Sequence, residues 1–137
     1  MALESLASVA QDVAADTPII FASRHGETQR SLGLIRELIA EGSVSPQSFS
    51  LSVHNATIGL HTIAQTSHAN VTALAGGAAT AQAILVETLG LLADGAESVL
   101  VVACDEILPE CYAPYADEPQ APFAWAAELV VGDEFTP

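Results

Sequence analysis

The sequence predicts an α/β protein, because short apolar segments typical of strands alternate with segments of helical spacing. Half of the 137 residues are hydrophobic and 15% are charged, so the chain can bury a sizeable core. Aromatic residues make up only 5%, which predicts an aliphatic, alanine-rich core suited to helices packed closely on a sheet. The continuous apolar run VLVVAC is typical of a strand in a parallel sheet covered on both faces.

The first half of the chain is predicted to hold two helices and a strand. Residues 2–14 have helical apolar spacing, and Pro18 opens the buried-strand segment PIIFAS. Thr28 is a candidate cap for a helix that runs to Glu41, and Gly42 stops that helix. The turn-rich segment SVSPQSFSLSVHN follows.

The middle of the chain is predicted to hold a short buried helix at 55–65 and a strand at 70–75. Gly76-Gly77 then makes a sharp turn into a long helix at 78–93. This helix has almost no polar face, and a helix that is apolar all round is expected to be buried on all sides. We therefore expect it to lie between layers of the fold.

The last third of the chain is predicted to hold two strands. Residues 97–106 form the first, a Pro-rich excursion follows at 107–122, and FAWAAELVV at 123–131 forms the second. No internal repeat or low-complexity linker interrupts the chain, so we expect residues 1–137 to belong to a single domain.

The charge balance excludes several classes of function. The chain has 3 basic and 17 acidic side chains and a net charge of −14, and its only cations besides histidine are Arg24, Arg30 and Arg36. Nucleic-acid binding is excluded because neutralising phosphates requires many Lys and Arg residues. A polyanionic substrate is disfavoured for the same reason.

Other sequence features point to a cytoplasmic protein without bound groups. Cys104 and Cys111 have neither metal-binding nor redox spacing, and no disulfide scaffold is indicated, so we expect a reducing compartment. No signal peptide or membrane span is predicted. We expect no cofactor and no metal site.

The segment Arg24-His25-Gly26-Glu27 is similar to the signature of histidine phosphatases, in which the histidine accepts a phosphoryl group. That chemistry needs further cationic and acid groups around the phosphate. No arginine follows Arg36, and the last histidine is His68. Phosphoryl transfer by His25 is therefore a remote alternative, and the simpler interpretation is a strand end followed by a turn.

A longer segment, from Ser45 to Glu106, resembles the N-terminal half of β-ketoacyl synthases, which have the thiolase fold. The resemblance covers about 60 residues with few gaps. The matching positions are Asn55, Gly59, Thr62, Ile63, Asn70, Thr72, Ala83, Ile84, Gly95 and Glu106. The resemblance implies a thiolase-like half-domain with a mixed, mostly parallel sheet. It also implies that the chain lacks the C-terminal half of the domain and begins after the domain's first strand.

The chain departs from the family at its nucleophile. Counted from Thr72, the position of the family's catalytic cysteine falls on Gly77, which has no side chain to form a thioester. The resemblance places Asn55, Gly59, Gly76 and Gly77 near the acyl tunnel. The family's catalytic histidines and lysine belong to the C-terminal half, and this chain contains no lysine.

The segments SPQSFSLSVHNA and FASRHGE resemble the sequences of a subgroup of the family. This subgroup consists of short, chain-length-factor-like proteins of type II fatty-acid and aryl-polyene systems. This predicts a non-catalytic subunit that partners a β-ketoacyl synthase in fatty-acid or polyketide synthesis. In the thiolase fold, the strand before the nucleophile turn pairs with the dimer mate. The resemblance thus assigns an interface with a ketosynthase or a second copy to Val71, Thr72, Ala73, Leu74 and Ala75.

Other chemistry stays open at this point. Cys104 is an alternative nucleophile for an acyltransferase or condensing enzyme, although small buried cysteines on strands are mostly packing residues. His54 and His61, seven residues apart, are a weak candidate for a metal pair. Asp105-Glu106 is either an acid-base or cation site, or a hydrogen-bonded strand end.

The acidic balance also bears on the acyl carrier protein. Carrier proteins are acidic and dock on basic patches, so a chain at −14 would repel them. We expect any contact with the carrier to be indirect, through a more basic partner.

Overall fold

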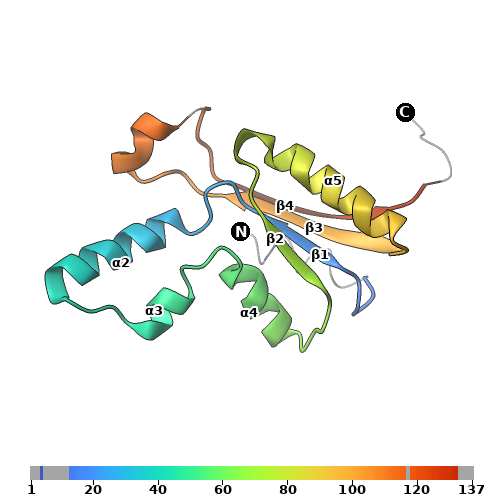
Figure 1. The fold of residues 1–137 in the computed structure, drawn as a ribbon, viewed down its shortest axis with the longest axis horizontal. Helices are drawn as coiled ribbons and strands as arrows, with labels where there is room; N and C mark the ends of the chain where they lie inside the picture. The colour runs from blue at the N-terminus through green and yellow to red at the C-terminus, as the bar shows by residue number, and fades with distance from the viewer. Residues whose placement is uncertain (1–3, 5–12, 117, 133–137) are drawn as a thin grey trace.

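The computed structural model describes residue 4, residues 13–116 and residues 118–132. The helix predicted at 2–14 lies almost wholly outside the described residues. Helices and strands alternate as predicted, and Figure 1 shows them arranged around one twisted sheet. The strands are β1 (Ile19–Ala22), β2 (Val71–Leu74), β3 (Ser98–Asp105) and β4 (Phe123–Val130). The helices are α2 (Thr28–Glu41), α3 (Pro46–Ser50), α4 (Ala56–Ala64) and α5 (Thr80–Ala93), with 3₁₀ turns η1 (Gly77–Ala79) and η2 (Glu110–Tyr115).

The sheet is mixed and mostly parallel, as predicted. Its strand order is β2-β1-β3-β4, in which β1 pairs in parallel with both β2 and β3, and β4 runs antiparallel to β3. The carboxyl ends of the three parallel strands therefore lie at one edge of the sheet, where open α/β sheets place their ligand sites.

Side chains of successive strand residues point to opposite faces, and each face has its own cluster of buried residues. One cluster receives Ile58 from α4, and the other receives Ile84 from α5. The first is built on Ile19, Phe21, Leu100 and Val102, and the second on Ile20, Ala22, Val99, Val101 and Ala103. Helices α4 and α5 thus cover opposite faces of the sheet (Figure 1).

Local sequence explains most of the helix boundaries. Helix α2 ends at Gly42, whose φ of +73° gives the left-handed cap that glycine favours. The predicted cap at Thr28 is wrong: Glu27 occupies the N-cap position, and Thr28 is already helical and donates its hydroxyl to the carbonyl of His25. The sequence analysis also missed α3, which starts at Pro46 with the Ser45 hydroxyl accepting from the N–H of Ser48.

Two helices are less covered than predicted. In α4, Ile58 and His61 are buried, but Ile63 is 77% exposed. In α5, Ile84 is buried against the sheet while Val86 is 71% exposed. The prediction that α5 is buried on all sides is therefore wrong for this chain: only the side of α5 that faces the sheet is buried. In the part of the chain that the structure describes, no helix is long and apolar enough to cross a membrane.

Candidate functional site

The turn after β1 is held by a carboxylate from β3. Asp105, the last residue of β3, accepts hydrogen bonds from the Ser23 hydroxyl at 2.9 Å and from the backbone N–H groups of Arg24 at 3.1 Å and His25 at 3.0 Å. The Ser23 hydroxyl in turn accepts from the N–H of Gly26 at 2.8 Å. Asp105 therefore serves as an acceptor that fixes the turn, which supports the hydrogen-bonded strand end among the alternatives for Asp105-Glu106.

The same turn leaves little room for added atoms. Gly26 has a φ of +56°, and a Cβ built there would lie 3.1 Å from Cδ2 of His54. The His54 ring packs edge-on against Phe21, and its Nε2 lies 2.8 Å from the carbonyl oxygen of Ser23. Because a carbonyl only accepts, Nε2 of His54 is the protonated nitrogen. Glycine at 26 follows from this close packing and from the positive φ.

The side chains of Arg24 and His25 do not form a phosphate site. The Arg24 guanidinium is largely buried and forms an ion pair with Glu118. Nε2 of His25 is buried and has no hydrogen-bond partner among the described residues. The carboxylate of Glu118 therefore pairs with the Arg24 side chain, and the carboxylate of Asp105 binds the backbone of this turn. A phosphatase needs cationic groups at this place to bind the phosphate.

The turn after β2 has a different construction. Strand β2 ends at Leu74, and the Thr80 hydroxyl accepts from the N–H of Gly76 at 3.1 Å and donates to the carbonyl of Gly77 at 2.7 Å. Gly77 has a φ of +55°, so the strand turns sharply into η1 and then into α5. This is the strand-to-helix turn that the sequence predicts.

The two glycines of this turn differ in their surroundings. A Cβ at Gly76 would lie 3.1 Å from backbone atoms of Ala79 and Thr80, whereas a Cβ at Gly77 would meet nothing within 4 Å. Gly77 also lines a cavity of about 190 Å³, whose other walls include Arg24, Ile84, Phe123 and Trp125. Gly77 thus combines a positive φ with enough open space for a side chain, although glycine has no side chain to place there.

Cys104 lies in a second cavity, of about 260 Å³, together with Glu27 and His54. Burial raises the pKa of the Cys104 thiol, and together with the nearby carboxylates of Asp105, Glu27 and Glu106 it brings this pKa to about 11. The thiolate is the nucleophilic form of cysteine, and this environment disfavours it. The geometry therefore gives no support to Cys104 as an activated nucleophile.

The histidine pair predicted as a weak metal candidate is not brought together. His54 lines the cavity that holds Cys104, whereas His61 lines a separate cavity of about 600 Å³. Burial lowers the pKa of His61. Among the described residues there is no group of three His, Cys, Asp or Glu side chains placed to hold a metal ion.

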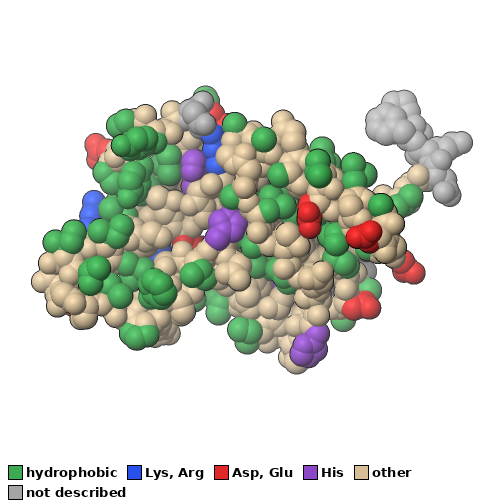
Figure 2. All heavy atoms as spheres, in the orientation of Figure 1, with side chains coloured by type: hydrophobic (Ala, Val, Ile, Leu, Met, Phe, Trp, Pro, Cys, Tyr) green, Lys and Arg blue, Asp and Glu red, His purple; other side chains and the backbone are tan. Residues whose placement is uncertain are grey.

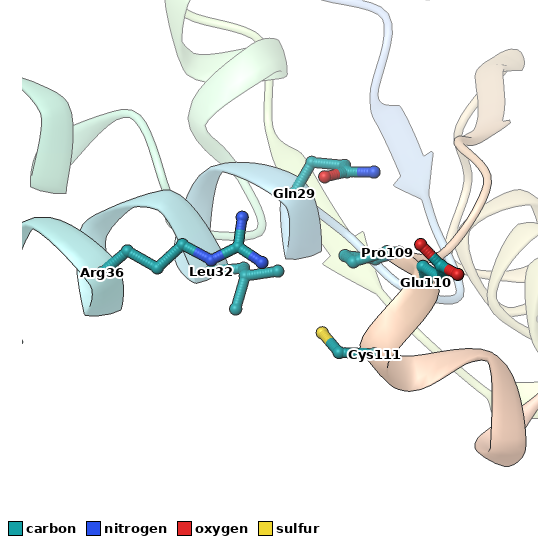
Figure 3. A pocket seen from close by; sticks show the side chains of 6 residues that line it. All are labelled: Gln29, Leu32, Arg36, Pro109, Glu110 and Cys111. Carbon is teal, nitrogen blue, oxygen red and sulfur yellow. The ribbon is translucent and has the colours of Figure 1, made fainter.

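A fourth cavity, of about 460 Å³, lies between α2 and η2. Figure 3 shows Leu32 and Arg36 of α2 facing Glu110 and Cys111 across it. In the same view the Arg36 side chain extends along α2 in the direction of Leu32.

The residues predicted near an acyl tunnel fall into two groups. Asn55 and Gly59 belong to α4 and its N-cap, on one face of the sheet, while Gly76 and Gly77 precede α5, on the other. Sequence analysis did not find the Asp105 hydrogen bonds to 23–25 or the contact of Arg24 with Glu118. The available signal was a serine and an aspartate, each directly at the end of a predicted strand.

These features, a strand-to-helix turn with positive φ at the carboxyl edge of a mixed sheet followed by an apolar helix, agree with the comparisons to known proteins. Residues 1–136 match the family model of the β-ketoacyl synthase N-terminal domain. The chain belongs to this family. No relative among curated protein sequences matches it.

Two solved structures are similar to the chain. One is the ketosynthase ApeO in complex with its chain length factor ApeC from Xenorhabdus doucetiae, with 31% identity and a TM-score of 0.87. The match covers 96% of this chain and 56% of that one, so the chain spans little more than half of the related chain's length. The other is the ishigamide ketosynthase/chain length factor, with 18% identity and a TM-score of 0.65 over 85% of this chain and 36% of that one. This second likeness shows the fold.

Proposed function

We propose that the chain is a non-catalytic, chain-length-factor-like subunit that partners a β-ketoacyl synthase in fatty-acid, polyketide or aryl-polyene biosynthesis. The observation that carries the proposal is Gly77. Gly77, the position to which the resemblance assigns the family's nucleophile, has a φ of +55° and open space at the Cβ position, but it has no side chain. The proposal places the subunit in the cytoplasm with its partner.

The raised pKa of Cys104 supports the same conclusion from another direction. With a pKa of about 11, roughly one thiol in a thousand is ionised at pH 8, so Cys104 is a poor replacement nucleophile. The acyltransferase alternative therefore has the thiol it requires but lacks the environment that would activate it.

The proposed interface with the partner is the free edge of β2. The strand order places β2 at one end of the sheet, with β1 as its neighbour, and Ala73 is exposed there. A small apolar edge strand is a template for pairing with another chain. The comparison with a ketosynthase and its chain length factor, which form a complex, supports a ketosynthase as the partner over a second copy.

Co-expression with candidate β-ketoacyl synthases tests the proposal. We expect a ketosynthase to co-purify with the tagged wild-type chain and with an Ala73→Ser variant. We expect it to be lost with Ala73→Asp, because the partner would bury the strand edge and leave the new charge unpaired. A condensation assay should show activity only when the synthase is present. If no ketosynthase co-purifies, or if Ala73→Asp retains it fully, the proposed partnership or its interface is wrong.

The charge of the chain gives a second test. Because the net charge is −14, we expect an acyl carrier protein to bind the complex through the synthase and not the isolated chain. Tight binding of the carrier to the isolated chain at physiological salt would contradict this part of the proposal.

A further inference from the structure

A buried arginine is unusual in a chain this acidic. The sequence holds 3 basic and 17 acidic side chains, and few basic side chains are visible beside the acidic ones on the face that Figure 2 shows. The side chain of Arg24 is nevertheless only 8% exposed. A guanidinium keeps its charge when it is buried, and it is strongly destabilising there unless an anion pairs with it. Arg24 therefore requires an anionic partner throughout the life of the folded chain.

Glu118, which pairs with Arg24, is only partly enclosed. Its side chain is 53% exposed, and it lies between η2 and β4, outside any helix or strand. Its carboxylate can exchange the contact with Arg24 for water at little cost, because ion pairs with a half-exposed member are weak. Arg24 thus always needs an anion, whereas this particular anion is replaceable.

The carboxylate of Asp105 lines the same cavity as Arg24 and Glu118, but it is already engaged. It accepts hydrogen bonds from the Ser23 hydroxyl and from the backbone N–H groups of Arg24 and His25. These bonds tie Asp105 to the turn after β1, so Glu118 is the exchangeable carboxylate of the two.

The cavity combines the cation with an apolar lining. Its volume is about 190 Å³, and at about 30 Å³ for each water molecule it has room for a ligand of about five or six non-hydrogen atoms. A Cβ at Gly77 would meet nothing within 4 Å, so this wall is open. The apolar lining consists of Ala22, Ala81, Ile84, Ala103, Phe123 and Trp125. A molecule with one carboxylate and a short alkyl chain matches both the charge and the apolar lining.

We propose that this cavity binds a short-chain carboxylate. The carboxylate of the ligand pairs with the guanidinium of Arg24 in place of Glu118, and the alkyl chain lies against Ile84 and Trp125. Glu118 is then a built-in competitor that keeps Arg24 paired in the absence of ligand. The proposal concerns this chain alone, so it can fail or succeed independently of a partnership through the β2 edge.

Titration of the full chain with propionate tests the proposal. The ionic strength is held constant, because salt weakens ion pairs. Trp125 is the only tryptophan of the sequence and lines the cavity, so its fluorescence reports on binding there. We expect a saturable change with propionate and none with 1-propanol or propylamine, which have the same alkyl chain and no carboxylate. Acetate should bind about fourfold more weakly than propionate, since it buries one CH₂ group fewer.

Variants of the two charged residues separate their roles. Arg24→Gln should abolish binding of propionate. Glu118→Gln should strengthen it by about fivefold, because the neutral amide no longer competes for the guanidinium. Glu110→Gln is the matched control and should leave binding unchanged, since Glu110 is an exposed carboxylate in η2 that lines a different cavity.

Thermal unfolding provides a second measurement on the same proteins. Propionate should raise the Tm of the wild-type chain and of Glu118→Gln, and circular dichroism checks that each variant is folded. If Arg24→Gln does not fold, the comparison of Glu118→Gln with Glu110→Gln decides. The proposal is overturned by the lack of a saturable response to propionate, by an equal response to 1-propanol, or by an unchanged affinity in Glu118→Gln.

Discussion

Two turns at the carboxyl edge of the sheet resemble each other in position and differ in construction. The turn after β1, at Ser23–Glu27, carries an arginine, a histidine and a glutamate, the residue types of a catalytic site. The turn after β2, at 75–80, carries alanine, glycine and threonine. Yet the first is fixed by Asp105 and an ion pair, while the second has a positive φ at Gly77 and open space at its Cβ position.

The difference teaches that reactive residue types alone do not define a site. At the first turn, the backbone N–H groups of Arg24 and His25 make the long-range contacts to Asp105, so the structural role belongs largely to the backbone. At the second turn, the backbone conformation of Gly77 is the feature on which the proposed function rests.

The largest expected effect is on the first turn. Asp105→Ala removes the acceptor of three hydrogen bonds and leaves two backbone N–H groups of a partly buried turn without it. We expect a loss of about 3 kcal/mol in the free energy of unfolding, because hydrogen bonds to charged groups are strong but these donors are only partly buried and regain water as partner. Urea denaturation measures this loss. Exposed Glu106→Ala is the matched control and should change stability by less than about 0.5 kcal/mol.

The glycine pair of the second turn gives the next largest effect. Gly76→Ala should cost about 2 kcal/mol, because its Cβ would press on backbone atoms at 3.1 Å that cannot easily move. Gly77→Ala should cost about 1 kcal/mol, because only the positive φ opposes it. Thermal unfolding of the two variants compares them directly. Equal losses would mean that the turn relaxes around the added atom at position 76.

A smaller effect is expected for the histidine of the first turn. His25→Ala keeps the backbone N–H that reaches Asp105 and removes a ring whose Nε2 has no partner in the described structure. We therefore expect a loss of about 1 kcal/mol or less in stability. Phosphate-monoester hydrolysis should be absent from both wild type and variant, and hydrolysis abolished by His25→Ala would instead support the phosphatase alternative.

The smallest effect concerns the helix that follows the second turn. The Thr88 hydroxyl is buried on the sheet side of α5 and has no hydrogen-bond partner in the described part of the chain. Thr88→Val replaces this hydroxyl with a methyl group of similar size, so stability should stay the same or rise by up to about 1 kcal/mol. A clear loss, measured by the same thermal unfolding, would reveal a hydrogen bond that the structure does not show.

The pattern of apolar residues was sufficient to predict β1, α2, α5, β3 and β4. Each of these elements has either a regular spacing of apolar residues or an unbroken apolar run, because its apolar side chains pack into the core. The pattern missed α3, since Ser45-Pro46 is equally typical of a turn and of a helix start. Gly77 was found only through resemblance to a family. The link from Asp105 to Ser23 joins residues 82 positions apart, and no local pattern predicts which strands will be neighbours in the sheet.

The most direct test of the central claim is to treat the co-purified complex with a reactive acyl thioester and to measure the intact mass of each subunit. We predict that the ketosynthase gains one acyl group and that this chain keeps its mass, because position 77 has no side chain and the thiol of Cys104 has a pKa of about 11. A stoichiometric acyl group on Cys104, lost in Cys104→Ser and accompanied by loss of condensation activity, would contradict the account.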